Sequence, residues 1–166
     1  MSLLGKPTDP DHGPGVRPTT PRANFSAMRV TEIVNAKGSD VHSLESSASV
    51  TELVQKLAQN KIGALLIIDG DQLVGIVSER DVVRFVAGGG DLSAPVGDIM
   101  TTDVATCSLD DEIESLATVM TGKRVRHLPV VEDGKVLAIV SIGDVVKGRL
   151  DELQAERDHL ADYVSS

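Results

Sequence analysis

The chain has 166 residues and a formal net charge of −9, and only 2% of its residues are aromatic. This balance argues against nucleic acid as the main partner, which needs clustered Lys and Arg or aromatic stacking platforms, and it predicts an aliphatic core. A single cysteine, Cys107, excludes an intrachain disulfide and a Cys-rich zinc site. No apolar run is long enough to span a bilayer or to serve as a secretory signal, so we expect a cytoplasmic protein without a membrane partner.

Residues 1–27 differ from the rest of the chain because they are rich in proline and poor in periodic apolar residues. Five of the seven prolines of the chain lie in this stretch. That composition is typical of a flexible, partly extended arm. An arm docked across a neighbouring subunit is the alternative.

The rest of the chain contains an internal repeat with an offset of 63 positions. Residues 62–83 align with residues 125–146, and seven of these 22 positions are identical. Such a duplication predicts two copies of one supersecondary unit that share a core. We therefore divide the chain into repeat 1 at residues 28–90, repeat 2 at residues 91–148 and a helical extension at residues 149–166.

Each repeat is predicted to begin with a short strand and an amphipathic helix. Residues 41–44 and 104–107 are the strand candidates, each after a turn-rich stretch. In repeat 1 a capping-box sequence at residues 49–52 precedes apolar residues spaced as on one helix face, and this helix runs to about Asn60. The same apolar spacing at residues 113–120 predicts the second copy of the helix.

A β-hairpin and a second helix complete each repeat. Apolar strands are predicted at residues 64–68 and 72–77, and again at residues 127–131 and 135–140. Asp and Gly residues separate the two strands of each pair, which is a strong hairpin signal. The order within each repeat is therefore β-α-β-β-α.

The last helix is predicted to run from about Asp144 past Leu160, well beyond the point where residues 88–90, three glycines, end its counterpart in repeat 1. Its apolar residues keep a heptad-like spacing that suits packing against a second subunit, so we expect a homodimer. The predicted fold class is α/β (α+β), with two tandem repeats related by a pseudo-twofold axis and an extended C-terminal helix.

A Ser-x-x-Asp motif stands at the same place in both repeats, where an apolar strand enters a helix. It consists of Ser78 and Asp81 in repeat 1, and of Ser141 and Asp144 in repeat 2. The free N–H groups of a helix N-terminus suit an anionic or hydroxyl-rich ligand, and the hydroxyl and carboxylate side chains are suited to the two hydroxyls of a ribose. The same spacing is nearly that of a capping box. Both interpretations stay open, because Ser can cap the helix while Asp faces a cleft.

The densest basic segment of this acidic chain is residues 123–129, which lies just before and within a predicted strand. It includes Lys123, Arg126 and His127, whereas its counterpart in repeat 1 has a single lysine. A cleft beside this segment would be better equipped for phosphate than the other cleft. Arg80, which has no basic counterpart in repeat 2, adds charge to one cleft only. A solvated basic edge that balances nearby acids is the alternative.

The remaining polar residues do not assemble a catalytic or metal site. Ser43 and Thr106 occupy matching positions on the first strand of each repeat, where a hydroxyl can meet a ligand or face water. Cys107 is interpreted as a small core residue, and the four histidines lack metal-ligand spacing. The sequence also lacks a phosphate loop and a nucleophile with its base. We therefore expect a protein that is not an enzyme and has no catalytic residue, catalytic cofactor or metal.

Together these motifs resemble the CBS-domain family, in particular small bacterial proteins that consist of little more than one CBS pair. The resemblance covers about residues 29–148. It rests on GIVSERDVVR in repeat 1, on RHLPVVEDGKVLAIVSIGDVV in repeat 2, and on the lead-in DIMTTDVATCSLDDEI between them. It implies a two-repeat disc, or Bateman module, whose two clefts bind adenine-containing ligands such as AMP, ADP, ATP, NAD or S-adenosylmethionine.

The resemblance also implies roles for individual residues. Ser78 with Asp81, and Ser141 with Asp144, would hold ribose. The base and phosphates would be framed by residues around the first strand and the R-H-x-P segment, namely Ser43, Ile62, Ala64, Thr106, Arg126, His127 and Pro129. Because RHLP in repeat 2 aligns with GALL in repeat 1, the two clefts are not expected to be equally occupied.

The function predicted from the sequence is that of a homodimeric regulatory sensor. It would bind AMP, ATP or NAD between the repeats and signal to an unknown partner protein. A dimeric interaction scaffold whose clefts have lost their ligand is the first alternative. An enzyme that uses Asp81 or Asp144, for example as a nucleotide hydrolase, is the second.

Overall fold

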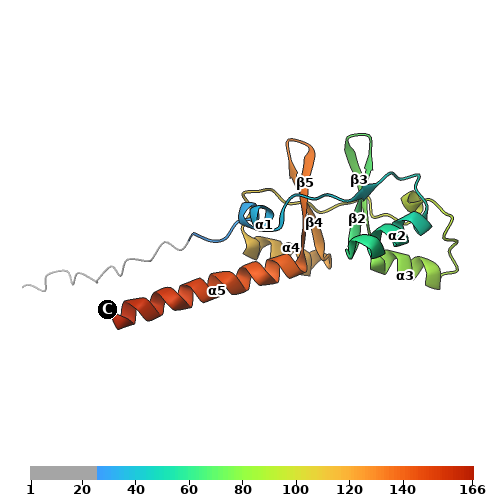
Figure 1. Cartoon of the computed structure of the whole chain (residues 1–166). Coiled ribbons are helices and arrows are strands. Elements are labelled where there is room, and N and C mark those ends of the chain that lie inside the picture. The colour runs from blue at the N-terminus through green and yellow to red at the C-terminus, as the bar shows by residue number, and fades with distance from the viewer. Residues whose placement is uncertain (1–25) are drawn as a thin grey trace, which may run out of the picture.

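In the computed structural model, residues 26–166 are described, and they form five α-helices, five strands and one short 3₁₀-helix (Figure 1). In chain order the elements are α1 (Val30–Lys37), β1 (Ser43–Leu44), α2 (Val50–Asn60), β2 (Ala64–Asp69), β3 (Gln72–Ser78), α3 (Glu79–Ala87), η1 (Val96–Asp98), α4 (Ile113–Lys123), β4 (His127–Glu132), β5 (Lys135–Ser141) and α5 (Ile142–Ser165). Nearly all of the predicted N-terminal arm lies outside the described residues. Both repeats contain a helix, a hairpin and a second helix in the predicted order, so the predicted fold class is confirmed.

The two predicted hairpins form and stand side by side (Figure 1). β2 pairs with β3, and β4 with β5, both antiparallel and with the same register shift before the turn. Ala64 at the start of β2 lies opposite Ser78, and His127 at the start of β4 lies opposite Ser141. The hairpin register therefore places Ala64 and His127 next to the two Ser-x-x-Asp motifs.

The first strand forms in repeat 1 but not in repeat 2. β1 pairs parallel with β2, and the Leu66 N–H donates to a backbone carbonyl of the segment before β1. The counterpart of Leu66 in repeat 2 is Pro129, which has no N–H to donate. Residues 104–107 therefore make only an isolated bridge between Cys107 and Val130, and the strand predicted there is wrong.

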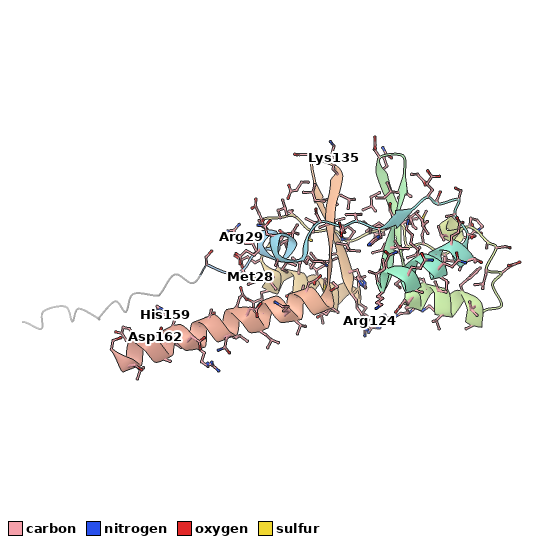
Figure 2. All side chains as sticks on the ribbon, viewed as in Figure 1. Met28, Arg29, Arg124, Lys135, His159 and Asp162 are labelled. Carbon is pink, nitrogen blue, oxygen red and sulfur yellow. The ribbon has the colours of Figure 1, made fainter. Side chains whose placement is uncertain are left out.

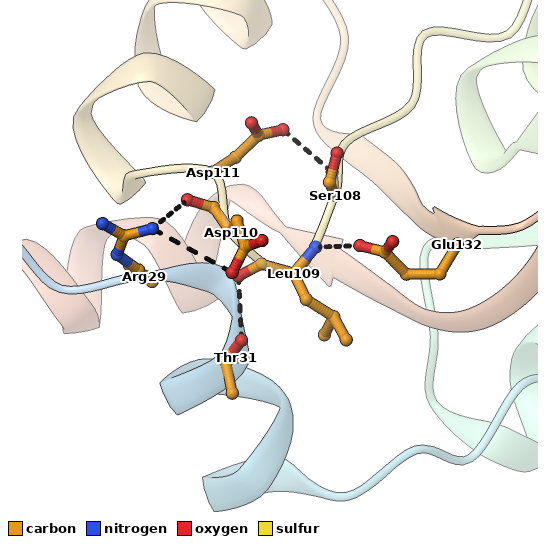
Figure 3. A network of polar contacts seen from close by, with 7 residues as sticks. All are labelled: Arg29, Thr31, Ser108, Leu109, Asp110, Asp111 and Glu132. Carbon is orange, nitrogen blue, oxygen red and sulfur yellow. Dashed lines mark hydrogen bonds and ion pairs between the residues drawn. The ribbon is translucent and has the colours of Figure 1, made fainter.

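Helix α1 is not part of the predicted order, and contacts with repeat 2 hold it in place. The backbone N–H and the hydroxyl of Thr31 both donate to the Leu109 carbonyl, and Arg29 pairs with Asp110 (Figure 3). Helix α1 has eight residues and no side-chain cap at its N-terminus. A helix this short is marginal in isolation, so tertiary contacts must stabilise it.

Two hydrophobic cores hold the fold together. The segment that leads into each repeat, which is α1 for repeat 1 and η1 with the residues up to 103 for repeat 2, packs on the core of the other repeat. Val30 and Ile33 of α1 are buried with residues of α4, β4 and β5. Val96 of η1 is buried with residues of α2, β2 and β3. The lead-in of repeat 1 thus completes the core of repeat 2, and the lead-in of repeat 2 completes the core of repeat 1. No aromatic residue is among the buried core residues of the described part, as the composition predicts.

Helix α5 is 24 residues long and runs past Leu160, as predicted. Its first turns pack against α4, and its C-terminal half extends away from the rest of the molecule (Figure 1). Leu160, Tyr163 and Val164 are exposed on that half. No other part of the described residues therefore covers these three apolar side chains.

Candidate ligand-binding site

A cavity of about 550 Å³ lies where the two repeats meet. It is formed by the start of β2, the β3–α3 junction, the segment after η1, and the end of α4 with the start of β4. Seven of the predicted site residues line it, namely Ala64, Ser78, Arg80, Asp81, Lys123, Arg126 and His127. A cavity of this size is in the usual range for a small-molecule site.

The other predicted site residues lie outside this cavity. They are Ser43 in β1, Ile62 before β2, Thr106 before the isolated bridge, Pro129 in β4, and Ser141 and Asp144 at the β5–α5 junction. The Ser43 carbonyl accepts a hydrogen bond from Lys56, and Ile62 packs against the core of repeat 1. The first motif and the basic segment thus come together, while the second motif lies apart.

The first motif is both a helix cap and part of the cavity wall. Asp81 Oδ2 accepts hydrogen bonds from the Ser78 backbone N–H at 2.8 Å and from the Ser78 hydroxyl at 2.9 Å. These contacts arise because β3 ends at Ser78 and Asp81 lies in the first turn of α3. Within the described residues Asp81 Oδ1 accepts no hydrogen bond. The two interpretations of the motif are therefore compatible, with one oxygen used for the cap and the other available to a ligand.

Five cationic side chains line the same cavity, namely Arg80, Arg84, Lys123, Arg124 and Arg126. In residues 26–166 none of them forms an ion pair or a side-chain hydrogen bond. The ion pairs of this region use other cations, which are Arg29, Lys37, Lys147, Arg149 and Arg157. Unpaired positive charge is thus concentrated at one cavity of an acidic chain, which favours an anionic ligand.

Four charged residues of the cavity were not among the predicted site residues, namely Glu79, Arg84, Asp103 and Arg124, although Arg124 belongs to the basic segment at residues 123–129. Arg84 lies one helical turn after Arg80, a spacing that places two side chains on the same helix face and was visible in the sequence. Arg124 ends α4 in the left-handed conformation at φ 54° and lies between the repeats (Figure 2). Asp103 belongs to the segment after η1, which a backbone bridge between Thr101 and Ile76 joins to β3.

His127 lies at the contact between the two repeats. A Cβ atom on Gly63 of repeat 1 would lie 3.4 Å from His127 Cε1, so the side chain closely approaches that glycine. Burial is the main cause that lowers the pKa of His127, and Lys37 adds to it, whereas Asp144 and Glu79 oppose it. His127 is therefore a neutral ring at neutral pH that can donate and accept hydrogen bonds at the cavity wall.

The second motif has the same local geometry but a different neighbour. The Ser141 backbone N–H donates to Asp144 Oδ2 at 2.8 Å, and Lys37 Nζ lies 2.6 Å from the same oxygen. Burial acts to raise the pKa of Asp144, but the hydrogen bonds from Lys37 and Ser141 outweigh it and lower the pKa below its usual value. Asp144 lines a smaller cavity of about 190 Å³ between α1 and α5, and Lys37 lines it too.

Cys107 is buried, and burial together with Asp111 raises the pKa of its thiol to about 12, so it is a core residue as predicted. Residues 26–166 contain no group of three or more His, Cys, Asp or Glu residues that could hold a metal ion. None of the helices in this range is long and apolar enough to cross a membrane.

Known proteins share this fold. The CBS domain family profile matches residues 30–88 and 96–151. The mitochondrial CBS domain-containing protein CBSX3 of Arabidopsis thaliana is 31% identical over 153 residues, which cover 86% of this chain and 74% of that protein. The crystal structure of a CBS-domain containing protein from Agrobacterium tumefaciens is 40% identical, with a TM-score of 0.72 over 76% of this chain and 96% of that one. A CBS domain protein from Pyrobaculum aerophilum complexed with AMP is 29% identical, with a TM-score of 0.65 over 70% of this chain and 89% of that one.

Each of the two matched segments contains one hairpin and one of the two Ser-x-x-Asp motifs, at the start of the helix that follows the hairpin. Pairs of CBS repeats are regulatory modules, and such pairs are typically not catalytic. On the evidence of the repeat, the fold and these matches, the chain belongs to the CBS-domain family.

Proposed function

We propose that the chain is a regulatory module that binds a phosphorylated adenosine compound, such as AMP, ATP or NAD, in the cavity between its repeats. The observation that carries this proposal is the meeting of Asp81, with its free Oδ1, and five unpaired cations at one cavity. The relative from Pyrobaculum aerophilum, solved in complex with AMP, supports a ligand of this class.

The two kinds of group suit the two ends of such a ligand. Asp81 Oδ1 is an acceptor for the hydroxyls of a ribose, and charge-assisted hydrogen bonds of this kind are the stronger ones. The guanidinium groups of Arg80 and Arg126, which come from opposite repeats, present forked donors that match phosphate oxygens. Ala64 and Ile76 supply apolar surface in the same cavity, which suits a purine ring.

Signalling would follow from the position of the cavity between the repeats. A ligand that contacts Arg80 on α3 and Arg126 before β4 lowers the free energy of the arrangement in which both are within reach. It therefore shifts the repeats toward that arrangement by its differential affinity for the two states. A partner protein that binds only one arrangement then responds to the concentration of the ligand.

The proposal includes a homodimer that covers the exposed helices. Val83 and Val86 of α3 are 66% and 50% exposed, and Val146 and Leu150 of α5 are 52% and 62% exposed. None of the residues of α3 is buried within the chain. A second copy would remove this apolar surface from water, which favours association.

The exposed helices also favour the alternative of a dimeric scaffold without a ligand. In that case the apolar faces of α3 and α5 are the functional feature, and the cationic cavity is empty in the cell. The two functions differ in one observable, because only the sensor binds nucleotide saturably.

The test is calorimetric titration of AMP, ATP and NAD into purified protein from which bound nucleotide has been removed. We expect saturable binding, and binding at least 10-fold weaker in an Arg126→Ala variant, which removes one cation from the cavity. Lys135→Ala is the matched control, because Lys135 is an unpaired cation at the tip of the β4–β5 hairpin, far from the cavity (Figure 2). No heat and no thermal stabilisation with any of the three nucleotides would favour the scaffold.

A further inference from the structure

Among the described residues, the second Ser-x-x-Asp motif has a cationic partner that the first motif lacks. Lys37 Nζ donates to Asp144 Oδ2 at 2.6 Å and to the Ile139 carbonyl at 3.0 Å. The Ser141 N–H donates to the same carboxylate oxygen. One ammonium group thus joins the motif carboxylate to the strand that leads into it.

The first motif shows what Lys37 replaces. In repeat 1 the carbonyl of Ile76, the counterpart of Ile139, accepts a hydrogen bond from the backbone N–H of Thr101 at 2.9 Å. No cation of the described residues forms an ion pair with Asp81. In repeat 2, Lys37 therefore donates to the Ile139 carbonyl, whose counterpart in repeat 1 is satisfied by the backbone. Lys37 also neutralises Asp144, whose counterpart Asp81 has no cationic partner among the described residues.

Packing fixes the position of Lys37. It is the last residue of α1, whose Val30 and Ile33 are buried in the core of repeat 2. Gly38 ends the helix with φ 88°, which favours glycine. Helix α1 thus directs Lys37 to the β5–α5 junction, although 107 residues separate Lys37 from Asp144 in the chain.

The second motif also has fewer unpaired cationic side chains around it than the first. Gly143 replaces Arg80, and the counterpart of Arg126 is Gly63. Lys147, the counterpart of Arg84, is paired with Asp151 at 3.1 Å. A phosphorylated ligand therefore has fewer free cations at the second motif than at the first.

We propose that Lys37 is an internal occupant of the second motif, so that each chain binds one ligand, in the cavity of the first motif, and that Lys37 prevents a second ligand from binding at Asp144. This inference rests on the proposed function, because it concerns the number of ligands that the pair of repeats accepts. Lys37 is a specificity-determining residue in this sense, since its ammonium group neutralises the Asp144 carboxylate and occupies the space beside Oδ2, while within the described residues Oδ1 accepts no hydrogen bond.

The test is the stoichiometry of AMP and adenosine binding, measured by calorimetry on the full chain and on Lys37→Ala. We expect one ligand per chain in the unchanged protein and two in Lys37→Ala, with the second event weaker and similar for AMP and adenosine because few free cations surround Asp144. Adding Asp81→Ala to Lys37→Ala should leave only the weaker event. Lys147→Ala is the matched control, since Lys147 lines the same small cavity but pairs with Asp151, and we expect it to bind one ligand.

The outcomes separate this inference from the proposed function. Two ligands per chain in the unchanged protein, or one in Lys37→Ala, overturn the inference and leave the proposed function standing. No binding by either protein overturns both. A measurement without ligand completes the test, because loss of the ammonium should raise the pKa of Asp144 in an NMR titration of Lys37→Met, a variant that keeps most of the side-chain volume. An unchanged Asp144 pKa would contradict the contact on which the inference depends.

Discussion

The two Ser-x-x-Asp motifs have the same backbone setting and opposite surroundings. Each begins at the last residue of a hairpin, and its carboxylate accepts a hydrogen bond from the backbone N–H of the helix N-cap. Asp81 then faces a cavity of about 550 Å³ with unpaired cations, whereas Asp144 is bound to Lys37 beside a cavity of about 190 Å³. The local motif therefore fixes the cap, and residues distant in the chain decide whether the carboxylate is paired with a cation.

The difference has its origin in the exchanged lead-in segments. The lead-in of repeat 2 brings Thr101 and Asp103 to the first motif, and the lead-in of repeat 1 brings Lys37 to the second. The two clefts differ because the segment that closes each cleft comes from the other repeat and because these two segments differ in sequence. Four changes, in order of decreasing expected effect, test this difference between the two clefts.

The largest effect is expected where α1 joins the core of repeat 2. Ile33→Ala should lower the free energy of unfolding by about 3 kcal/mol, because it leaves a cavity in a packed core. Urea denaturation measures this loss. Val54→Ala is the control, since Val54 on α2 is 39% exposed and lies outside the proposed dimer surface, so its truncation should change stability by less than about 0.5 kcal/mol. An equal, small effect of both changes would show that α1 is not part of that core.

The next effect separates the two carboxylates in ligand binding. Asp81→Ala should weaken AMP binding by about 100-fold, since it removes an acceptor for the ribose hydroxyls, while Asp144→Ala should change it little. Calorimetry on the two variants measures both affinities. Each change removes the same capping hydrogen bond, at the start of α3 or of α5. The difference in AMP affinity between the two variants therefore reports on contact with the ligand. Equal weakening by the two changes would refute the unequal clefts.

A smaller effect is expected from the charge that only the first cleft has. Arg80→Ala should weaken ATP binding by about 10-fold and leave adenosine binding nearly unchanged, because Arg80 is assigned to the phosphates. Binding of both ligands at low and high salt measures the effect, which should shrink as salt screens the charge. If adenosine binding weakens as much as ATP binding, Arg80 does not contact phosphate.

The smallest effect is expected from His127, which lies between the two clefts. Its pKa is lowered by burial and by Lys37, while Asp144 and Glu79 oppose the shift. The unfolded chain therefore binds more protons between the pKa of the folded state and 6.5, and stability should fall as pH is lowered from 6.5 through that window. Urea unfolding at several pH values measures this slope, and His127→Gln should flatten it. A slope that persists in His127→Gln would assign the pH dependence to other groups.

The sequence determined the features that depend on neighbouring residues. The Asp and Gly turns between apolar strands predicted both hairpins, and the apolar spacing predicted α2, α4 and the long α5. The hydroxyl and carboxylate of each Ser-x-x-Asp motif predicted a helix start. These signals are visible in one sequence because hairpin turns, helix caps and amphipathic faces are set by residues within a few positions of one another.

Tertiary structure alone decided which of these elements meet. Helix α1 is too short and too weakly capped to be recognised from its own residues, and it exists because Val30 and Ile33 have a core to enter. The missing strand at residues 104–107 follows from Pro129, which lies more than 20 positions away in the chain. The pairing of Lys37 with Asp144, and the meeting of Arg80 with Arg126, likewise join residues from different repeats. Such contacts depend on how the two repeats pack, and local propensity carries no information about that packing.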